Sequence, residues 1–261
     1  MFEFAANLEW LFAEEAGGDE AETADRVRAA AALGLPAVEI WGWRAKNLDR
    51  LAGALTETGL VLQTMCVEPM GRLTDPATHP AFLTGVAESA AVADRLSCPY
   101  LVVTAGDRRP GVAPDEQRAA VVAALRQAAT LLEGRCATLL VENLNSRVDH
   151  VATFLDSTTA CLDILDEVGS AKVRLLYDLY HSLVMGERPE KALAGRVGVV
   201  AHVQIADVPG RHEPGTGRVD WDRELSVLAA LGYRGRIGLE YRPAARTARS
   251  LEHIMTRQAR L

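Results

Sequence analysis

The chain has 261 residues and a formal net charge of −7, with 49% hydrophobic and 24% charged residues. This composition is ordinary for a globular protein, and the acidic balance argues against a nucleic-acid partner, because phosphate binding needs a basic face. No apolar run reaches the roughly 20 residues needed to cross a bilayer, and the N-terminus lacks the pattern of a signal peptide. We therefore expect a cytoplasmic protein with no membrane partner.

The four cysteines indicate a reducing compartment. Cys66, Cys98, Cys136 and Cys161 are widely separated and show no paired CxxC spacing, so we expect free thiols rather than a zinc site or a disulfide framework. The length fits either two small domains or one eight-stranded α/β barrel, which typically has about 250 residues.

Short apolar runs alternate with helical patterns along the whole chain. The expected strands cover about 2–8, 37–41, 60–67, 100–106, 138–143, 173–180, 197–206 and 236–241. The expected helices cover about 22–33, 47–58, 82–96, 114–133, 158–168, 189–194, 220–231 and 245–255. Asn47 is a suitable N-cap, and Gly34, Gly59 and Gly169 are suitable helix stops.

This alternation, with strands that are apolar enough to be buried on both faces, predicts a single (β/α)₈ TIM barrel over residues 1–261. No linker divides the chain. A doubly wound sheet is disfavoured because no glycine-rich phosphate-binding turn follows the first expected strand.

Four polar side chains stand at the ends of four consecutive expected strands. They are Glu142, Asp178, Gln204 and Glu240, spaced 36, 26 and 36 residues apart. In a TIM barrel the C-terminal strand ends face the active site, so these residues should form an arc on one rim. A single acid at such a position is more often a helix cap or a solvated rim residue, but four in register favour a functional site.

Three crowded carboxylates raise one another's pKa unless a cation lies between them. A ligand set of Glu142, Asp178, Gln204 and Glu240 offers only oxygen atoms, which favours Mg²⁺ or Mn²⁺ over zinc. Glu142 and Glu240 could also remove and return a proton next to a polarised carbonyl group. The pattern therefore predicts a divalent metal and a pair of catalytic glutamates acting on a small molecule.

Further residues are candidates for substrate binding. His181 follows Asp178 by three residues and could donate a hydrogen bond to a substrate oxygen, and Arg211 could clamp a carboxylate or hydroxyl groups. Glu39 ends the second expected strand and could line the pocket or hold a neighbour. A loop histidine without a role and a solvated arginine are the competing interpretations.

Seven segments resemble hydroxypyruvate isomerases, which belong to the xylose-isomerase-like TIM barrels. The segments are FAANL (4–8), VE (38–39), VENLN (141–145), YDLYH (177–181), HVQIAD (202–207), EPGTG (213–217) and GLEY (238–241). The resemblance implies isomerisation of hydroxypyruvate to 2-hydroxy-3-oxopropanoate, with Glu142 and Glu240 as the proton donor and acceptor. It also implies substrate binding by His181 and Arg211.

The related ketose 3-epimerases bind a divalent metal through Glu, Asp, His and Glu, and Gln204 stands where their histidine is. This difference implies a metal that is held less tightly or is not strictly required. The family commonly has Glu-Pro after the fifth strand, whereas this chain has Glu142-Asn143, and residues 145–150 also depart from the family pattern. The resemblance therefore leaves the substrate open between hydroxypyruvate, a 2-oxo-tetronate and a free ketose.

Two alternative interpretations assign the chain a function other than isomerisation. An abasic-site endonuclease on the same barrel would need several metals and many histidine ligands, and the chain has only six histidines. A catalytically silent binding subunit would not need acids at so many strand ends. The alanine- and leucine-rich outer helices are compatible with a homo-oligomer, either a dimer or a tetramer, and equally with an ordinary barrel exterior.

Overall fold

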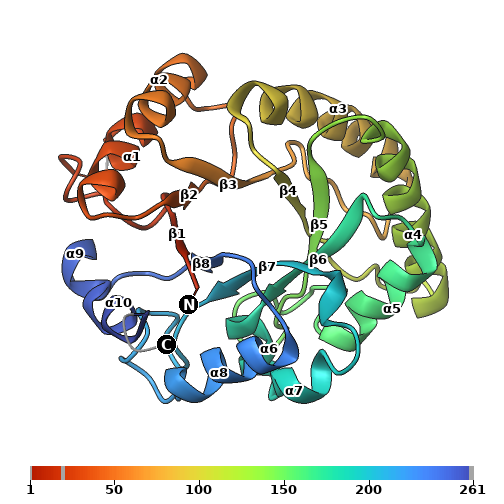
Figure 1. Cartoon of the computed structure of the whole chain (residues 1–261). Helices are drawn as coiled ribbons and strands as arrows, with labels where there is room; N and C mark the ends of the chain where they lie inside the picture. The colour runs from red at the N-terminus through yellow and green to blue at the C-terminus, as the bar shows by residue number, and fades with distance from the viewer. Residues whose placement is uncertain (1, 19–20, 259–261) are drawn as a thin grey trace.

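The computed structural model describes residues 2–18 and 21–258. Eight parallel strands close into one barrel in the order β1 to β8, and the helices lie around the outside (Figure 1). The strands are β1 (Phe4–Asn7), β2 (Ala37–Glu39), β3 (Val61–Cys66), β4 (Tyr100–Val103), β5 (Thr138–Glu142), β6 (Val173–Asp178), β7 (Val200–Ile205) and β8 (Ile237–Leu239). The predicted TIM barrel is thereby confirmed.

The helices begin and end largely where local signals place them. They are α1 (Thr23–Ala32), α2 (Leu48–Thr58), α3 (His79–Leu96), α4 (Pro114–Leu131), α5 (Thr158–Val168), α6 (Leu179–Met185), α7 (Pro189–Ala192), α8 (Trp221–Leu231), α9 (Thr247–Ser250) and α10 (Glu252–Gln258), with 3₁₀ turns at η1 (Pro76–Thr78) and η2 (Val197–Val199). The Asn47 side chain caps α2 by accepting a hydrogen bond from the Arg50 N–H over 3.1 Å. Gly59 and Gly169 end α2 and α5 with φ angles of 72° and 68°, which favour glycine.

Several boundaries differ from the prediction, and three of the differences have an identifiable local cause or form. β6 stops at Asp178, two residues earlier than expected, and α6 begins at once, with Asp178 as its N-cap. The apolar run continues into this helix, so periodicity alone does not separate strand from helix. α3 begins at His79 because Pro80 is tolerated in a first helical turn. The expected last helix is divided into α9 and α10.

The barrel interior and the shell between strands and helices are both packed with apolar side chains. Inside the barrel, Val102, Leu140 and Leu176 form a separate small cluster. This packing fills the barrel, so a functional cavity has to lie at its end. All four cysteines are free, as expected. Among the described residues, no helix has the length and apolar character that a membrane span needs.

Candidate active site

The main cavity opens at the C-terminal ends of the strands. It has a volume of about 580 Å³ and is lined by Trp10, Trp41, Gly42, Cys66, Val67, Glu68, Pro69, Met70, Thr104, Glu142, Leu144, Asp149, His150, Arg211, Glu240 and Arg242. Its size is typical of a pocket for a small molecule. Glu142 and Glu240, the two predicted catalytic residues, therefore face one common space.

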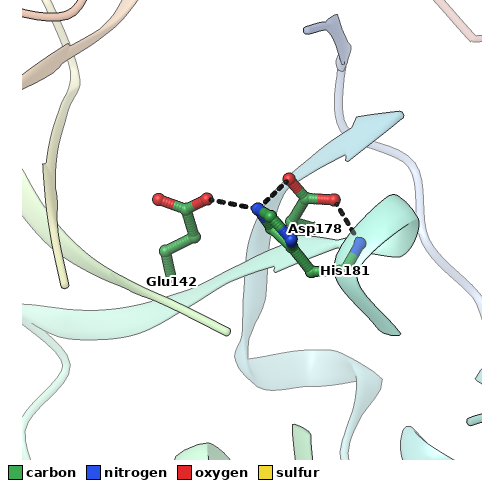
Figure 2. A group of neighbouring side chains, drawn as sticks. All are labelled: Glu142, Asp178 and His181. Carbon is green, nitrogen blue, oxygen red and sulfur yellow. Dashed lines mark hydrogen bonds and ion pairs between the residues drawn. The ribbon is translucent and has the colours of Figure 1, made fainter. Parts of the chain in front are cut away.

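Glu142, Asp178 and His181 form a cluster beside this cavity, and their side chains point toward one another (Figure 2). One candidate ligand atom from each lies within 4.8 Å of the other two, so the group could hold a metal ion. His181 Nε2 is 3.4 Å from Asp178 Oδ2 and 3.8 Å from Glu142 Oε1. The capping bond from the His181 N–H to Asp178 Oδ1, 3.0 Å long, fixes the start of α6 in this arrangement.

The hydrogen bonds of Asn145 determine which nitrogen of His181 carries the proton. Asn145 Oδ1 accepts from the backbone N–H groups of Val148 and Asp149, and Asn145 Nδ2 donates to the Asp149 carboxylate over 2.7 Å. The second hydrogen on Nδ2 therefore points to His181 Nδ1, 2.6 Å away, which must accept it. In a neutral imidazole the proton is then on Nε2, which faces Glu142 and Asp178.

This tautomer bears directly on the role of His181. To bind a cation through Nε2, the ring would have to carry its proton on Nδ1, where Asn145 offers no acceptor. Burial, followed by the charge of Arg211, lowers the pKa of His181 well below its ordinary value, so the ring is neutral. With these hydrogen bonds, His181 presents an N–H donor to the site, as substrate binding requires.

Gln204 places a free carbonyl oxygen in the same site. Its Nε2 donates to Glu39 Oε2 over 3.0 Å and approaches Glu240 Oε1 at 3.5 Å. These two acceptors fix the orientation of the amide. Gln204 Oε1 is buried and has no hydrogen-bond partner within the described part of the chain. A buried carbonyl of this kind is a suitable cation ligand, because leaving it unpaired costs about 1–3 kcal/mol.

Glu39 does not line the cavity, in contrast to the expected substrate contact. Its side chain is fully buried, and its two oxygens bind Gln204 Nε2 and His202 Nε2. The neighbouring strand makes room for this carboxylate through Gly238, where a Cβ atom would overlap the Glu39 carboxylate. Glu39 therefore holds Gln204 and lies below the cavity floor.

Glu240 receives several hydrogen bonds. Arg211 Nη2 donates to Glu240 Oε2 over 2.7 Å, and Trp41 Nε1 donates to Oε1 over 2.7 Å. The Arg211 guanidinium carbon is 5.0 Å from the ring centroids of both Trp10 and Tyr180. This aromatic contact on two rings holds the guanidinium in place, and the donors favour the carboxylate form of Glu240.

Burial dominates the acid–base properties of the cluster. It raises the pKa of Glu142 well above the ordinary value, and repulsion from Glu240 and Asp178 adds to the shift. It raises the pKa of Asp178 to about 8 against the opposing attraction of Arg211. The pKa of Glu240 is also raised by burial, while Arg211 and Trp41 oppose the rise. The protein alone therefore does not stabilise three carboxylate charges here.

The charge balance of the cluster would suit a divalent cation. Three ionised carboxylates (Glu142, Asp178 and Glu240) and the single guanidinium of Arg211 leave two negative charges uncompensated, which a +2 ion would balance. The free Gln204 Oε1 adds a neutral oxygen donor. Of the four predicted strand-end residues, Glu142 and Asp178 belong to the compact group with His181. Gln204 and Glu240 lie 3.5 Å from each other, and Arg211 connects Glu240 to Asp178.

The sequence does not indicate the contacts through which several further residues shape this site. Trp41 donates to Glu240, Asn145 sets the His181 tautomer, and Tyr180 donates to Asp149 over 2.8 Å. Asn7 also donates to Glu240 Oε1, over 3.2 Å. Asn7 was recognisable, because it ends β1 as Glu142 ends β5.

Comparisons with known proteins agree with this geometry. Residues 27–257 match the family model described as a xylose isomerase-like TIM barrel. A human protein provisionally named as a hydroxypyruvate isomerase is 32% identical over 96% of this chain and 93% of its own length. The hydroxypyruvate isomerase of Escherichia coli is 29% identical, with 96% and 97% covered. The 2-oxo-tetronate isomerase of Cupriavidus necator is 30% identical, with 96% of each covered.

Among solved structures, a protein from Brucella melitensis titled AP endonuclease, family 2, superposes with a TM-score of 0.89. It is 28% identical, and the match covers 98% of this chain and 99% of that one. The resemblance drawn from the strand-end motifs is confirmed by the sequence relatives. The chain belongs to the xylose isomerase-like TIM barrel family.

Proposed function

We propose that the protein is an aldose–ketose isomerase that interconverts hydroxypyruvate and 2-hydroxy-3-oxopropanoate, or a closely related hydroxy-oxo acid. The observation that carries this proposal is that Glu142 and Glu240 face one cavity in different hydrogen-bonding environments. The relatives named as hydroxypyruvate isomerases support the substrate class.

The reaction needs one group to take a proton from C3 of hydroxypyruvate and one to deliver a proton to C2. The electron pair of the C3–H bond becomes the C2=C3 bond of an enediolate. The C3 carbonyl then forms as O3 loses its hydroxyl proton, and O2 gains a proton. Glu240 is suited to be the base, because Arg211 and Trp41 donate to its carboxylate. Glu142 then serves as the acid that protonates C2.

His181 and Arg211 would orient the substrate between these two glutamates. The Nε2–H of His181 is buried and makes no hydrogen bond within the described residues, so it is available to a substrate oxygen on which negative charge develops. A donor placed where charge grows stabilises the transition state more than the ground state.

Glu142, Asp178, Gln204 and Glu240 would hold a divalent cation, for which their oxygen donors favour Mg²⁺ or Mn²⁺. When bound, the ion supplies positive charge that stabilises an enediolate. Arg211 already provides one positive charge at Glu240. We therefore expect the metal to increase the rate without being strictly required.

The test is an assay of the purified protein with hydroxypyruvate in D₂O, with Mg²⁺, Mn²⁺ or EDTA. Proton transfer through solvent-exchangeable glutamates should place deuterium at C2 of the product, detected by NMR. Glu240→Gln should lower kcat by roughly 10²–10⁴-fold, with the circular dichroism spectrum unchanged. Absence of product with hydroxypyruvate, or near-normal turnover by Glu240→Gln, contradicts the proposal.

A 2-oxo-tetronate isomerase is the second candidate. The relative with this name is as similar as the hydroxypyruvate isomerases, and a cavity of about 580 Å³ also admits a four-carbon acid. A ketose 3-epimerase, which would use the same proton transfer through an enediolate, is a further alternative. Comparing kcat/KM for hydroxypyruvate, a 2-oxo-tetronate and a free ketose distinguishes the three.

A further inference from the structure

The cavity contains an arginine that pairs with no acidic side chain in the described part of the chain. Glu68, Glu142, Asp149 and Glu240 supply carboxylates to the cavity wall, and Arg211 and Arg242 supply guanidinium groups. Arg211 is committed, since it lies 2.7 Å from Glu240 and 3.8 Å from both Asp149 and Asp178. Arg242 forms no ion pair with an aspartate or glutamate within residues 2–18 and 21–258.

Arg242 is a solvent-exposed residue whose backbone is held by hydrogen bonds. Its backbone N–H donates to the Arg211 carbonyl over 2.9 Å, and its own carbonyl oxygen lies 2.7 Å from His212 Nδ1. Its guanidinium carbon is 5.1 Å from the ring centroid of Trp10, the same ring that Arg211 contacts. An aromatic ring, rather than an acid, thus holds this side chain at the cavity wall and leaves its donors free.

A carboxylate that enters this cavity would meet four acidic side chains. Like charges at such distances disfavour binding unless a cation faces the entering group. The charge of Arg211 is already shared by Glu240, Asp149 and Asp178, so it offsets these acids rather than an entering carboxylate. A planar guanidinium with free N–H groups is well matched to a carboxylate, which it can bind through two parallel hydrogen bonds.

We propose that Arg242 binds the carboxylate of the substrate and thereby makes the site selective for hydroxy-oxo acids over uncharged ketoses. This inference rests on the proposed function in one respect, namely that the substrate reacts in the cavity between Glu142 and Glu240. Beyond the proposed function, it assigns to Arg242 the selection of the substrate class. Arg242 contacts the substrate but takes no part in the proton transfer.

Two substrates that differ in one group test this role. Hydroxypyruvate carries a carboxylate where dihydroxyacetone carries a CH₂OH group. Arg242→Gln should raise KM for hydroxypyruvate roughly tenfold or more, as loss of a hydrogen-bonded charge pair implies, with a smaller change in kcat. Turnover of dihydroxyacetone, if the wild type shows any, should change by less than about twofold. Arg242→Lys, which keeps the charge, should recover part of the loss.

Arg246→Gln is the matched control. Arg246 lies four residues further along, pairs with Glu14 at the surface and does not line the cavity, so this variant removes the same charge without touching the site. Its kinetic constants should equal those of the wild type. An equal loss of activity toward both substrates in Arg242→Gln, or an unchanged KM for hydroxypyruvate, overturns the proposal.

A binding measurement separates this inference from the proposed function. D-Glycerate has the carboxylate of hydroxypyruvate but a hydroxyl group at C2 in place of the keto group, so it cannot undergo this isomerisation. Titration calorimetry should show binding of D-glycerate to the wild type and to Arg246→Gln, and at least roughly tenfold weaker binding to Arg242→Gln. Equal affinity in all three proteins, or no binding to the wild type, overturns the role of Arg242 whether or not hydroxypyruvate is turned over. An inactive wild type with Arg242-dependent glycerate binding rejects the isomerase reaction alone.

Discussion

The side-chain amide of Asn143 pairs with the backbone of Asp178. Asn143 Oδ1 accepts from the Asp178 N–H, and Asn143 Nδ2 donates to the Asp178 carbonyl, each over 3.0 Å. The amide thereby imitates one more rung of the β5–β6 ladder, just beyond the last backbone pair. The residue at which the chain departs from the Glu-Pro pattern thus connects the ends of the two strands that carry Glu142 and Asp178.

Replacement of this amide should destabilise the barrel. Asn143→Ala leaves a buried N–H and a buried carbonyl group unpaired, and we expect the free energy of unfolding to fall by about 2 kcal/mol. Urea denaturation measures the change. Gln127→Ala, which removes an amide from the exposed face of α4, should stay within about 0.5 kcal/mol of the wild type. Equal stability of the two variants would show that the Asn143 pair contributes nothing.

The His181 tautomer can be observed directly. In ¹⁵N-labelled protein, long-range ¹H–¹⁵N NMR spectra should show Nδ1 of His181 unprotonated and Nε2 protonated. Asn145→Asp replaces the donor by an acceptor, so the proton should move to Nδ1. The site then loses its N–H donor, and kcat should fall at least roughly tenfold. A wild-type spectrum with the proton already on Nδ1 contradicts this assignment and leaves His181 Nε2 available to a cation.

The metal-free protein should become less stable as pH rises. Burial, opposed in part by Arg211, raises the pKa of Asp178 to about 8, so the folded state binds a proton that the unfolded state has already released. Between about pH 4 and pH 8 the unfolded chain therefore binds fewer protons, and stability declines with pH. In EDTA, the stability of Asp178→Asn relative to the wild type should increase by at least about 1.4 kcal/mol over this range, the equivalent of one pH unit.

Thermal or urea unfolding at a series of pH values measures this difference. Asn retains the capping oxygen that accepts from the His181 N–H, so the variant changes the charge while keeping the local structure. Saturating Mn²⁺ should reduce the difference, because the ion stabilises the ionised carboxylate. A constant difference between the two proteins from pH 4 to pH 8 would show that Asp178 ionises normally in the folded state.

Glu39 should matter for metal binding although it would not touch the ion. Glu39→Ala frees the amide of Gln204 to rotate, and loss of such a supporting contact typically weakens metal affinity 10–100-fold. Titration with Mn²⁺ followed by electron paramagnetic resonance measures it. Glu57→Gln is a control at an exposed glutamate that pairs with Arg28. Unchanged Mn²⁺ affinity in Glu39→Ala would show that Gln204 is not a ligand.

The fold and the strand-end residues could be predicted because both follow from local patterns. Apolar runs alternate with capped helices, and one polar residue closes each of four strands, so the barrel topology alone places Glu142, Asp178, Gln204 and Glu240 on one rim. The predicted cytoplasmic location and the dimer or tetramer stay predictions.

What could not be predicted depends on contacts between distant segments. Trp41 and Glu240 are 199 residues apart in sequence, and nothing near either residue indicates their hydrogen bond. Arg211 and Arg242 are chemically identical in the sequence, and only the structure distinguishes the one that is engaged by acids from the one that is free. The position of Glu39 below the cavity floor likewise depends on strand register.

Gly238 also limits which substitutions this site can accept, because a glycine has no side chain to occupy the space beside it. Glu39, Gln204 and Gly238 lie on β2, β7 and β8, and the glutamate fits only because the glycine leaves space beside it. A mutation that adds a side chain at position 238 would push the carboxylate away from Gln204. A histidine in place of Gln204 would lose the amide that Glu39 now accepts from. A substitution at any one of these three positions therefore alters the packing or the hydrogen bonding of the other two.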